Sequence, residues 1–215
     1  MRILYCLPSL LLLVSLAVAQ RKESAISLRP MLVRIVTEEA NGNGFVVGKT
    51  GDSIYIVTAR HVTETVKDKN HIPLDFGGNE KDIIGGQVVY TGEGDDDVAL
   101  LAAYQPAFNF TPLSIEERPD FNADLFYIET FGAKDTLPLD FNASFKCAND
   151  EKYRYQVYLR GLSGGHSGGP VFNAATNCII GVVLEGGYPA ILMQIERIRM
   201  LIQDKFNSHW QLKQY

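Results

Sequence analysis

The feature that most constrains the fold is a series of short segments near the N-terminus, rich in valine and isoleucine and separated by turn signals. The segments are residues 31–37, 45–47 and 53–58, and their β-branched composition favours strands. Asparagine and glycine at 41–44, and glycine with aspartate at 49–52, are typical of turns. Strands joined by connections this short can pair only antiparallel. This part of the chain is therefore predicted to form an antiparallel β-sheet.

The rest of the chain contains further predicted strands and one predicted helix. Apolar residues recur at helical spacing between Ile195 and Phe206, which predicts a C-terminal α-helix. Residues 103–122 contain three prolines and little periodicity, so we interpret them as the link between two β-rich halves. The predicted fold class is all-β with one terminal helix. Further strands are predicted at 88–90, 98–102, 125–130, 153–159, 170–172 and 178–184.

Residues 1–19 have the pattern of a secretory signal peptide. A positive charge near the start is followed by an apolar stretch over residues 3–16 and by Ala17-Val18-Ala19, an A-x-A cleavage site. The alternative is a membrane anchor, but the apolar stretch is shorter than the roughly 20 residues that span a bilayer. We therefore expect a secreted or periplasmic protein without stable membrane insertion after cleavage. Residues 20–30 form a polar N-terminal segment of that product.

Two cysteines, Cys147 and Cys178, remain after removal of the leader, and they lie on either side of a glycine-rich run. In an oxidising compartment they could form one disulfide. The alternative is a pair of buried thiols, because a disulfide requires Cα atoms within about 7 Å of each other. The sequence leaves both possibilities open.

The glycine-rich run at 161–173 contains the strongest candidate for a nucleophile, Ser167. Residues 165–169 match G-x-S-x-G, the nucleophile elbow of α/β-hydrolases. That type of enzyme needs an acid and a histidine after the serine, and only Asp204 and His209 are available. The Gly-Gly-Pro that follows the serine suits the required helix poorly, and the alternation of parallel strands with helices is missing. This interpretation is therefore disfavoured.

A serine hydroxyl becomes a nucleophile when a base takes its proton and a third group orients that base. His61 directly follows a predicted strand, Asp97 opens another, and Ser167 lies in Gly-His-Ser-Gly-Gly-Pro. In these motifs and their order the chain resembles the trypsin-like (chymotrypsin-fold) serine peptidases, particularly the protease domain of the HtrA family. Gly42-Asn43-Gly44-Phe45-Val46 resembles that group's strand ahead of the histidine, and residues 179–183 resemble its strand beside the specificity pocket.

The resemblance implies two antiparallel six-stranded β-barrels with the active site in the cleft between them. The peptidase domain would cover residues 31–207, with the first barrel at about 31–105, the second at about 120–194 and the helix at about 195–206. The implied substrate is a polypeptide, and no cofactor or metal is expected. The formal net charge of −5 argues against a nucleic-acid partner. Few residues follow the helix, so we expect no PDZ domain of the kind common in HtrA proteins.

The resemblance also assigns roles to individual residues. Ser167 would attack the scissile carbonyl, His61 would accept its proton, and Asp97 would orient His61 and stabilise the imidazolium. Asp97 is preferred to the two aspartates before it because it directly precedes the apolar strand. The backbone N–H groups of Gly165 and Ser167 would form the oxyanion hole.

Specificity follows from the residues that the resemblance places around the substrate pocket. No carboxylate stands at the base of that pocket, so we expect cleavage after small or medium apolar residues rather than after lysine or arginine. Glu185 could influence outer subsites. The pocket residues are Gly161 at the base, Leu184, Glu185 and Gly186 on the wall, and Ala190 nearby.

Two further expectations concern regulation and the alternative function. Digestive enzymes of this type have an aspartate before the catalytic serine, and it binds the N-terminus that zymogen cleavage releases. Here that position is His166, so no activation cleavage beyond leader removal is expected. The alternative function is a catalytically silent peptide-binding domain on the same fold.

Overall fold

The computed structural model describes residues 29–37, 41–64, 66–77, 83–120, 126–131, 138–143, 147–149, 153–158 and 160–215. Within these ranges, Met31–Tyr215 forms one compact unit. The leader predicted at 1–19 lies outside the described residues. No helix in the described ranges has the length and apolar character needed to cross a membrane.

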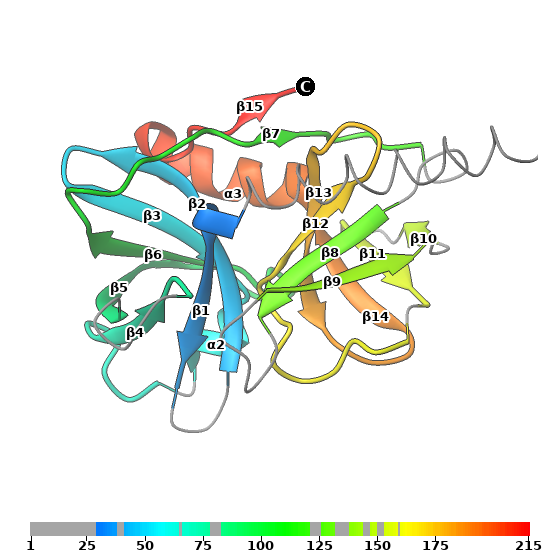
Figure 1. The fold of residues 1–215 in the computed structure, drawn as a ribbon, viewed down its shortest axis with the longest axis horizontal. Helices are drawn as coiled ribbons and strands as arrows, with labels where there is room; N and C mark the ends of the chain where they lie inside the picture. Colours follow the sequence, from blue (N-terminus) through cyan, green and yellow to red (C-terminus); the bar gives the residue numbers. More distant parts are fainter. Residues whose placement is uncertain are drawn as a thin grey trace, which may run out of the picture. The chain divides into compact units, whose positions relative to one another are not determined.

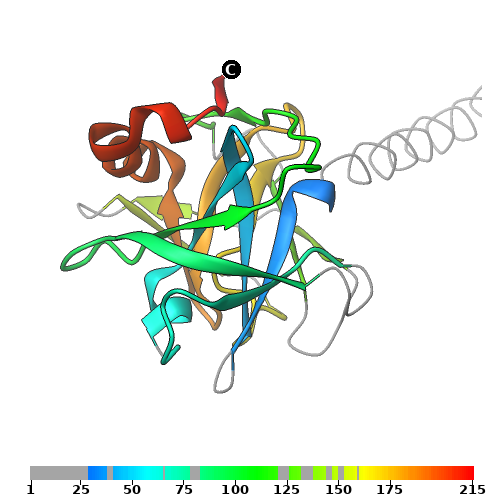
Figure 2. The same cartoon turned by 90° about the vertical axis from the view of Figure 1, so that its left-hand side faces the viewer.

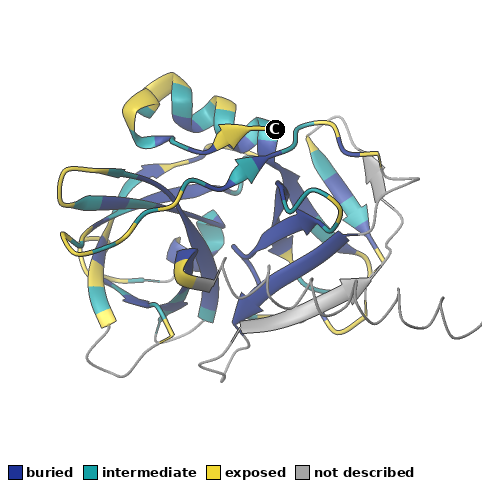
Figure 3. Cartoon of the chain, turned by 45° about the horizontal axis from the view of Figure 1, so that its top comes forward, coloured by how far each residue is buried: buried dark blue, intermediate teal, exposed yellow. Residues whose placement is uncertain are grey.

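The first half of the compact unit is a closed β-barrel (Figure 1). All its strand pairs are antiparallel, in the spatial order β1-β2-β3-β6-β5-β4. Buried valine, isoleucine and leucine side chains form its core, and Figure 3 colours much of its strands as buried. The predicted antiparallel barrel is therefore confirmed in this half. Its strands are β1 (Leu32–Val36), β2 (Asn41–Thr50), β3 (Ser53–Thr58), β4 (Ile72–Asp75), β5 (Ile83–Thr91) and β6 (Ala99–Tyr104).

The second half is a nine-stranded sheet with the main path β10-β11-β14-β13-β12-β8-β9. The prediction of an all-β fold is confirmed, but this sheet has more strands than the expected six. Two short strands, β7 (Ser114–Ile115) and β15 (Lys213–Gln214), run parallel to each other, and β7 also pairs with β13. The other strands are β8 (Phe126–Phe131), β9 (Pro138–Ala143), β10 (Cys147–Asn149), β11 (Arg154–Val157), β12 (Pro170–Asn173), β13 (Ile179–Glu185) and β14 (Ala190–Gln194).

The C-terminal helix α3 (Ile195–Phe206) has the bounds that the sequence predicted. It buries Ile198 and Ile202 and contacts β13 and β14 of the second half. The chain then returns to the first barrel through the 3-10 helix η3 (Asn207–His209), which contacts β2 (Figure 2). The ring of His209 stacks on Tyr55 with 3.7 Å between centroids. The end of the chain therefore packs against both halves.

The turn predicted at 41–44 is wrong, because these residues are the first part of β2. Gly42 pairs with Ile35, and Gly44 pairs with Val33. A Cβ atom on Gly44 would lie only 2.8 Å from Ile56 Cγ2. Glycine is therefore required here by close packing of the strand in the barrel, and not by a turn.

The disulfide considered between Cys147 and Cys178 is not formed. Cys178 is a free, buried thiol, and its Sγ lies 3.5 Å from the carbonyl oxygen of Thr176. Cys147 lies on β10, and Cys178 directly precedes β13, two strands further along the sheet path than β11. At about 4.8 Å between neighbouring strands, that separation exceeds the reach of a disulfide. The side chain of Cys147 lies outside the described residues.

Candidate active site

His61 and Asp97 are brought together by the pairing of β3 with β6. Thr58, the last residue of β3, pairs with Ala99, the first residue of β6. His61 lies in the short helix α2 (Arg60–Glu64), which follows β3. Its Nδ1 is 2.7 Å from Asp97 Oδ2, and its backbone N–H donates to Asp97 Oδ1 at 2.9 Å. Both carboxylate oxygens therefore orient the histidine.

The two groups shift each other's pKa in opposite directions. The hydrogen bond to Asp97 raises the pKa of His61 despite partial burial, and the negative charges of Asp97, Glu185 and Glu64 add to this effect. Burial alone would raise the pKa of Asp97, but the hydrogen bonds from the ring and backbone of His61 outweigh it and lower that pKa. Asp97 is therefore ionised across the neutral range, and it favours the protonated imidazolium.

This coupling predicts an activity that depends on pH. A general base must be neutral, so hydrolysis should be lost as the pH falls through the pKa of His61. Because that pKa is raised above 6.5, the midpoint of the acid limb should lie above pH 6.5. A profile of kcat/KM against pH measures this midpoint for the free enzyme. A midpoint below 6.5 would contradict the assignment of His61 as the base held by Asp97.

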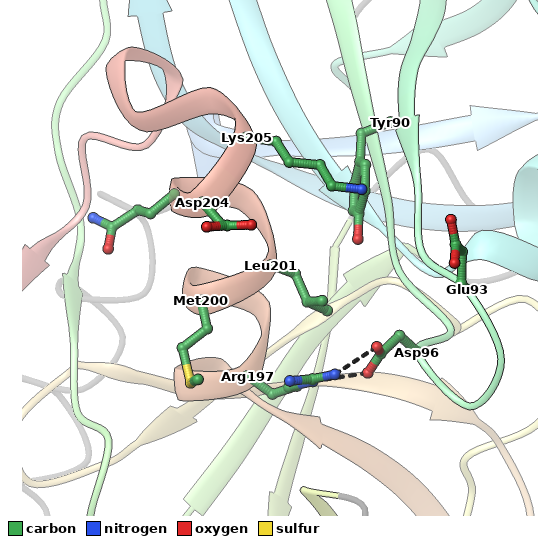
Figure 4. Close-up of a pocket in the computed structure, with 9 residues that line it drawn as sticks. Tyr90, Glu93, Asp96, Arg197, Met200, Leu201, Asp204 and Lys205 are labelled. Carbon is green, nitrogen blue, oxygen red and sulfur yellow. Dashed lines mark hydrogen bonds and ion pairs between the residues drawn. The ribbon is translucent and has the colours of Figure 1, made fainter.

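The loop that carries Asp97 is held by two arginines. Arg60 Nη1 donates to the carbonyl oxygens of Gly92 and Gly94 at 3.0 and 3.1 Å. Arg197 on α3 forms a bidentate ion pair with Asp96 at 2.9 and 2.7 Å, beside a groove of about 620 Å³ between α3 and this loop (Figure 4). Asp96 is therefore engaged away from the histidine, and Asp97 is the aspartate that reaches His61.

The loop before β12 leaves two backbone donors, on Gly165 and Ser167, without a partner among the described residues. Gly165 has a φ of 98° and Gly168 a φ of 85°, values that favour glycine. Alternate N–H groups in the loop are engaged: that of His166 donates to Ser163 O at 3.4 Å, and that of Gly168 donates to Val183 O at 2.7 Å. The N–H groups of Gly165 and Ser167 form no hydrogen bond within the described part of the chain. They are available to bind an oxyanion.

Ser167 is anchored to β2 of the first barrel, and the next residue lies beside the end of β3 that leads to His61. The carbonyl oxygen of Ser167 accepts a hydrogen bond of 2.7 Å from the backbone N–H of Asn43. A Cβ atom on Gly168 would collide with the carbonyl oxygen of Asn43 and would lie 2.5 Å from Thr58 Oγ1. Among the described residues, Ser167 Oγ and the ring of His61 form no direct hydrogen bond. In unliganded active sites this bond is often long and shortens only with substrate.

His166 does not face the reaction site as a base. It is 5% exposed, and its Nδ1 lies 2.9 Å from Ser163 O and 3.0 Å from Ser163 N. The histidine therefore bridges the two ends of the turn before Ser167. It stabilises this loop from within.

The predicted pocket residues fall into two groups. Glu185 is exposed, and Gly161 lies in an exposed turn with a φ of 100°. Leu184 and Ala190 are buried at 3% and 0% exposure, and Ala190 belongs to the core of the second sheet. Gly186 packs directly on the backbone of Ser163, where any Cβ atom would collide. The two segments that carry the predicted pocket residues therefore touch at Gly186 and Ser163.

Three residues that hold the site were missed in the sequence. Asn43 was included in a turn, although it forms four hydrogen bonds to the second half. The sequence offers one signal for Arg60, which is its position directly before His61. Arg197 had no signal, because its partner Asp96 lies 101 residues away.

Sequence and structure comparisons point to one group of proteins. Residues 42–182 match the family model of the trypsin-like peptidase domain. No curated protein matches the chain. The fold is similar to a serine endoprotease from Yersinia pestis, with a TM-score of 0.66 and 16% identity over 86% of this chain and 65% of that chain.

Two other solved structures are similar over most of their length. One is a protease from M. tuberculosis in its active form, with a TM-score of 0.60 and 19% identity over 83% of this chain and 82% of that chain. The other is a serine protease of a human pathogenic astrovirus, with a TM-score of 0.56 and 20% identity over 78% of this chain and 90% of that chain. At this level of identity the likeness shows a shared fold.

Proposed function

Because the chain belongs to the family of trypsin-like peptidase domains, we propose that it is a serine endopeptidase whose triad is His61, Asp97 and Ser167. The observation that carries this proposal is the double contact of His61 with Asp97, through the ring at 2.7 Å and the backbone at 2.9 Å. A histidine oriented in this way is the base that a serine nucleophile requires.

The proposed reaction passes through an acyl-enzyme. Ser167 Oγ attacks the carbonyl carbon of the scissile bond, and His61 Nε2 takes the serine proton. The C–N bond then breaks as His61 returns that proton to the leaving amine, and water hydrolyses the acyl-serine by the same route. The unengaged N–H groups of Gly165 and Ser167 stabilise the negative oxygen in each tetrahedral intermediate.

Reaction with a fluorophosphonate tests this function directly. An activated Ser167 should form a covalent phosphonyl adduct, which mass spectrometry locates on the peptide that contains residue 167. The second candidate function, a catalytically silent peptide-binding domain, predicts peptide binding without labelling. Its support is the absence of a Ser167–His61 hydrogen bond among the described residues. A wild-type protein that binds peptides but stays unlabelled would replace the proposed function with this one.

We further propose that cleavage follows small or medium apolar residues. Gly161, at the predicted base of the pocket, carries no charged side chain, and Leu184 and Ala190 offer apolar surroundings, which favours an apolar side chain over a long basic one. A peptide library should therefore yield alanine, valine or leucine before the cleaved bond. Cleavage profiles dominated by lysine or arginine would contradict this prediction.

Export remains part of the proposal. The sequence pattern of residues 1–19 supports removal of a leader and action on polypeptides outside the cytoplasm. Expression of the full chain in a secreting host, followed by N-terminal sequencing of the exported product, tests it. A mature N-terminus at Gln20 is expected, and a product that keeps residues 1–19 would contradict the proposal.

A further inference from the structure

Asn43 connects the two halves of the molecule at the nucleophile loop. It lies in β2 of the first barrel and is 1% exposed. Its backbone N–H donates to Ser167 O at 2.7 Å. Its Nδ2 donates to Gly165 O at 2.7 Å and to Phe131 O at 3.3 Å, and its Oδ1 accepts from the N–H of Phe131 at 2.6 Å. One buried side chain therefore joins β2, the end of β8 and the loop before Ser167.

The hydrogen bonds of the His166 ring hold Ser163, but the two glycines that follow need a constraint from outside the loop. Gly164 and Gly165 are adjacent glycines, and glycine adopts many backbone conformations at little cost. No atom lies within 4 Å of the position that a Cβ on Gly164 would take, so packing does not fix the loop at this point. The carbonyl oxygen of Gly165 belongs to the peptide unit directly after the Gly165 N–H donor. A hydrogen bond that fixes this carbonyl therefore restricts the orientation of the donor.

Asn43 itself is held firmly from the first barrel. Thr58 Oγ1 donates to Asn43 O at 2.6 Å, and Asn43 pairs with Arg34 across β1 and β2. Gly168 packs against the carbonyl of Asn43 with no space for a side chain. The side-chain amide thus projects from a rigid strand, which is the support that a precise site requires.

We propose that Asn43 is a positioning residue that sets the two oxyanion donors, Gly165 N–H and Ser167 N–H, by fixing the carbonyl oxygens of the same two residues. This inference rests on the proposed serine peptidase function. Asn43 does not touch the reacting atoms. Its amide is needed as a donor toward Gly165 and as an acceptor toward Phe131, a combination that neither aspartate nor a shorter residue reproduces at neutral pH.

Asn43→Asp gives the sharpest test, because it preserves size and keeps Oδ1 while a carboxylate oxygen replaces the Nδ2 donor. The retained Oδ1 can still accept from Phe131 N–H, but an ionised carboxylate would face the carbonyl oxygens of Gly165 and Phe131 without a proton to donate. At pH 8 we expect kcat and the rate of fluorophosphonate labelling to fall about 10- to 100-fold, somewhat less than the loss of an oxyanion donor itself. KM should change little, because the oxyanion forms only after binding.

Acid should partly restore the variant. A protonated carboxylic acid can donate to Gly165 O, and burial favours this neutral form. The ratio of variant to wild-type kcat should therefore rise as the pH is lowered from 8 to about 5.5, although both absolute rates fall with protonation of His61. With kcat expressed per folded protein, from circular dichroism at each pH, a merely structural role would not produce this recovery.

Asn173→Asp serves as the matched control. Asn173 is also fully buried, and its Nδ2 donates to Glu116 Oε2 at 2.8 Å, at the end of β12 remote from the oxyanion donors. A carboxylate there should lower the melting temperature without a pH-dependent ratio of kcat. If the wild type is labelled and Asn43→Asp is labelled at the same rate at pH 8, the proposed role of Asn43 is overturned. The peptidase function would remain supported in that case.

A wild type that is not labelled would instead overturn the peptidase function. If Asn43→Asp does not fold at pH 8, Asn43→Ser replaces it, because the shorter side chain leaves Gly165 O without its donor and introduces no charge. A folded Asn43→Ser protein with wild-type kcat and labelling rate would overturn the proposal. A loss of 10-fold or more at unchanged KM would support it.

Discussion

A Ser167→Ala variant is expected to lose kcat by a factor on the order of 10⁶, as deletion of a triad serine does in other serine peptidases. The alanine removes the only atom that can form the acyl-enzyme, and His61 then has no hydroxyl to deprotonate. Some rate above that of the uncatalysed reaction should remain, since the N–H groups of Gly165 and residue 167 still stabilise the negative oxygen. The measurement is kcat on a peptide substrate, with fluorophosphonate labelling alongside.

The control for this experiment is Ser208→Ala. Ser208 is exposed, and its hydroxyl lies 3.1 Å from Nδ1 of His209, beyond the end of α3. The control should keep wild-type kcat and labelling. Peptide hydrolysis that is unchanged in Ser167→Ala would rule out Ser167 as the nucleophile. Melting temperatures close to wild type in both variants would show that any loss reflects chemistry rather than unfolding.

Much of the fold could be predicted because its signals are local. The β-branched run at 53–58 became β3 with the same bounds, and the helical spacing from Ile195 to Phe206 became α3. In both segments the apolar pattern matches the period of the element and the face that it buries. The strand β15, in contrast, consists of exposed Lys213 and Gln214. It is held by backbone pairing with β7 and by a long-range hydrogen bond from Gln214 to Glu117, and neither leaves a local pattern in the sequence.

The candidate triad could be identified from the sequence because its residues adjoin strong strand signals. His61 follows β3 and Asp97 precedes β6, so the pairing of two predictable strands brings the two side chains together. The contacts that hold the site were not predictable in the same way. The partners of Asn43 lie 88 and 122 residues away in the chain, and the local Asn-Gly pattern favoured a turn. Tertiary packing overrode this local preference.

The long-range contacts that hold the site have a physical consequence for its geometry. Its two halves come from separate sheets, and long-range side chains such as Asn43 connect them. The catalytic geometry therefore depends on the docking of the halves, whereas each sheet depends mainly on its own core. Mutations of the side chains that connect the two halves should therefore cause a large loss of activity and only a small loss in the free energy of unfolding.

An Asp97→Asn variant is expected to lose kcat by about 10⁴, the effect of this exchange in a serine peptidase triad. The amide oxygen can still accept from the backbone N–H of His61. The amide nitrogen, however, must donate where the carboxylate accepted, so it stabilises the tautomer of His61 with its proton on Nε2. That nitrogen then cannot accept the proton of Ser167. Loss of the carboxylate also removes the hydrogen bond that is the main cause of the raised pKa of His61, together with the charge that adds to it.

The pH profile separates this explanation from simple loss of structure. In Asp97→Asn the acid limb of the remaining activity should move to lower pH than in the wild type, because the imidazolium is no longer stabilised by a neighbouring carboxylate. Asp95→Asn is the matched control, since Asp95 is exposed and the bond that its backbone oxygen accepts from the N–H of Asp97 is kept in the variant. Its kcat and its acid limb should stay at wild-type values. If Asp97→Asn kept full activity while Asp95→Asn lost it, the orienting acid would have to be reassigned, and the 2.7 Å contact between His61 and Asp97 would no longer explain catalysis.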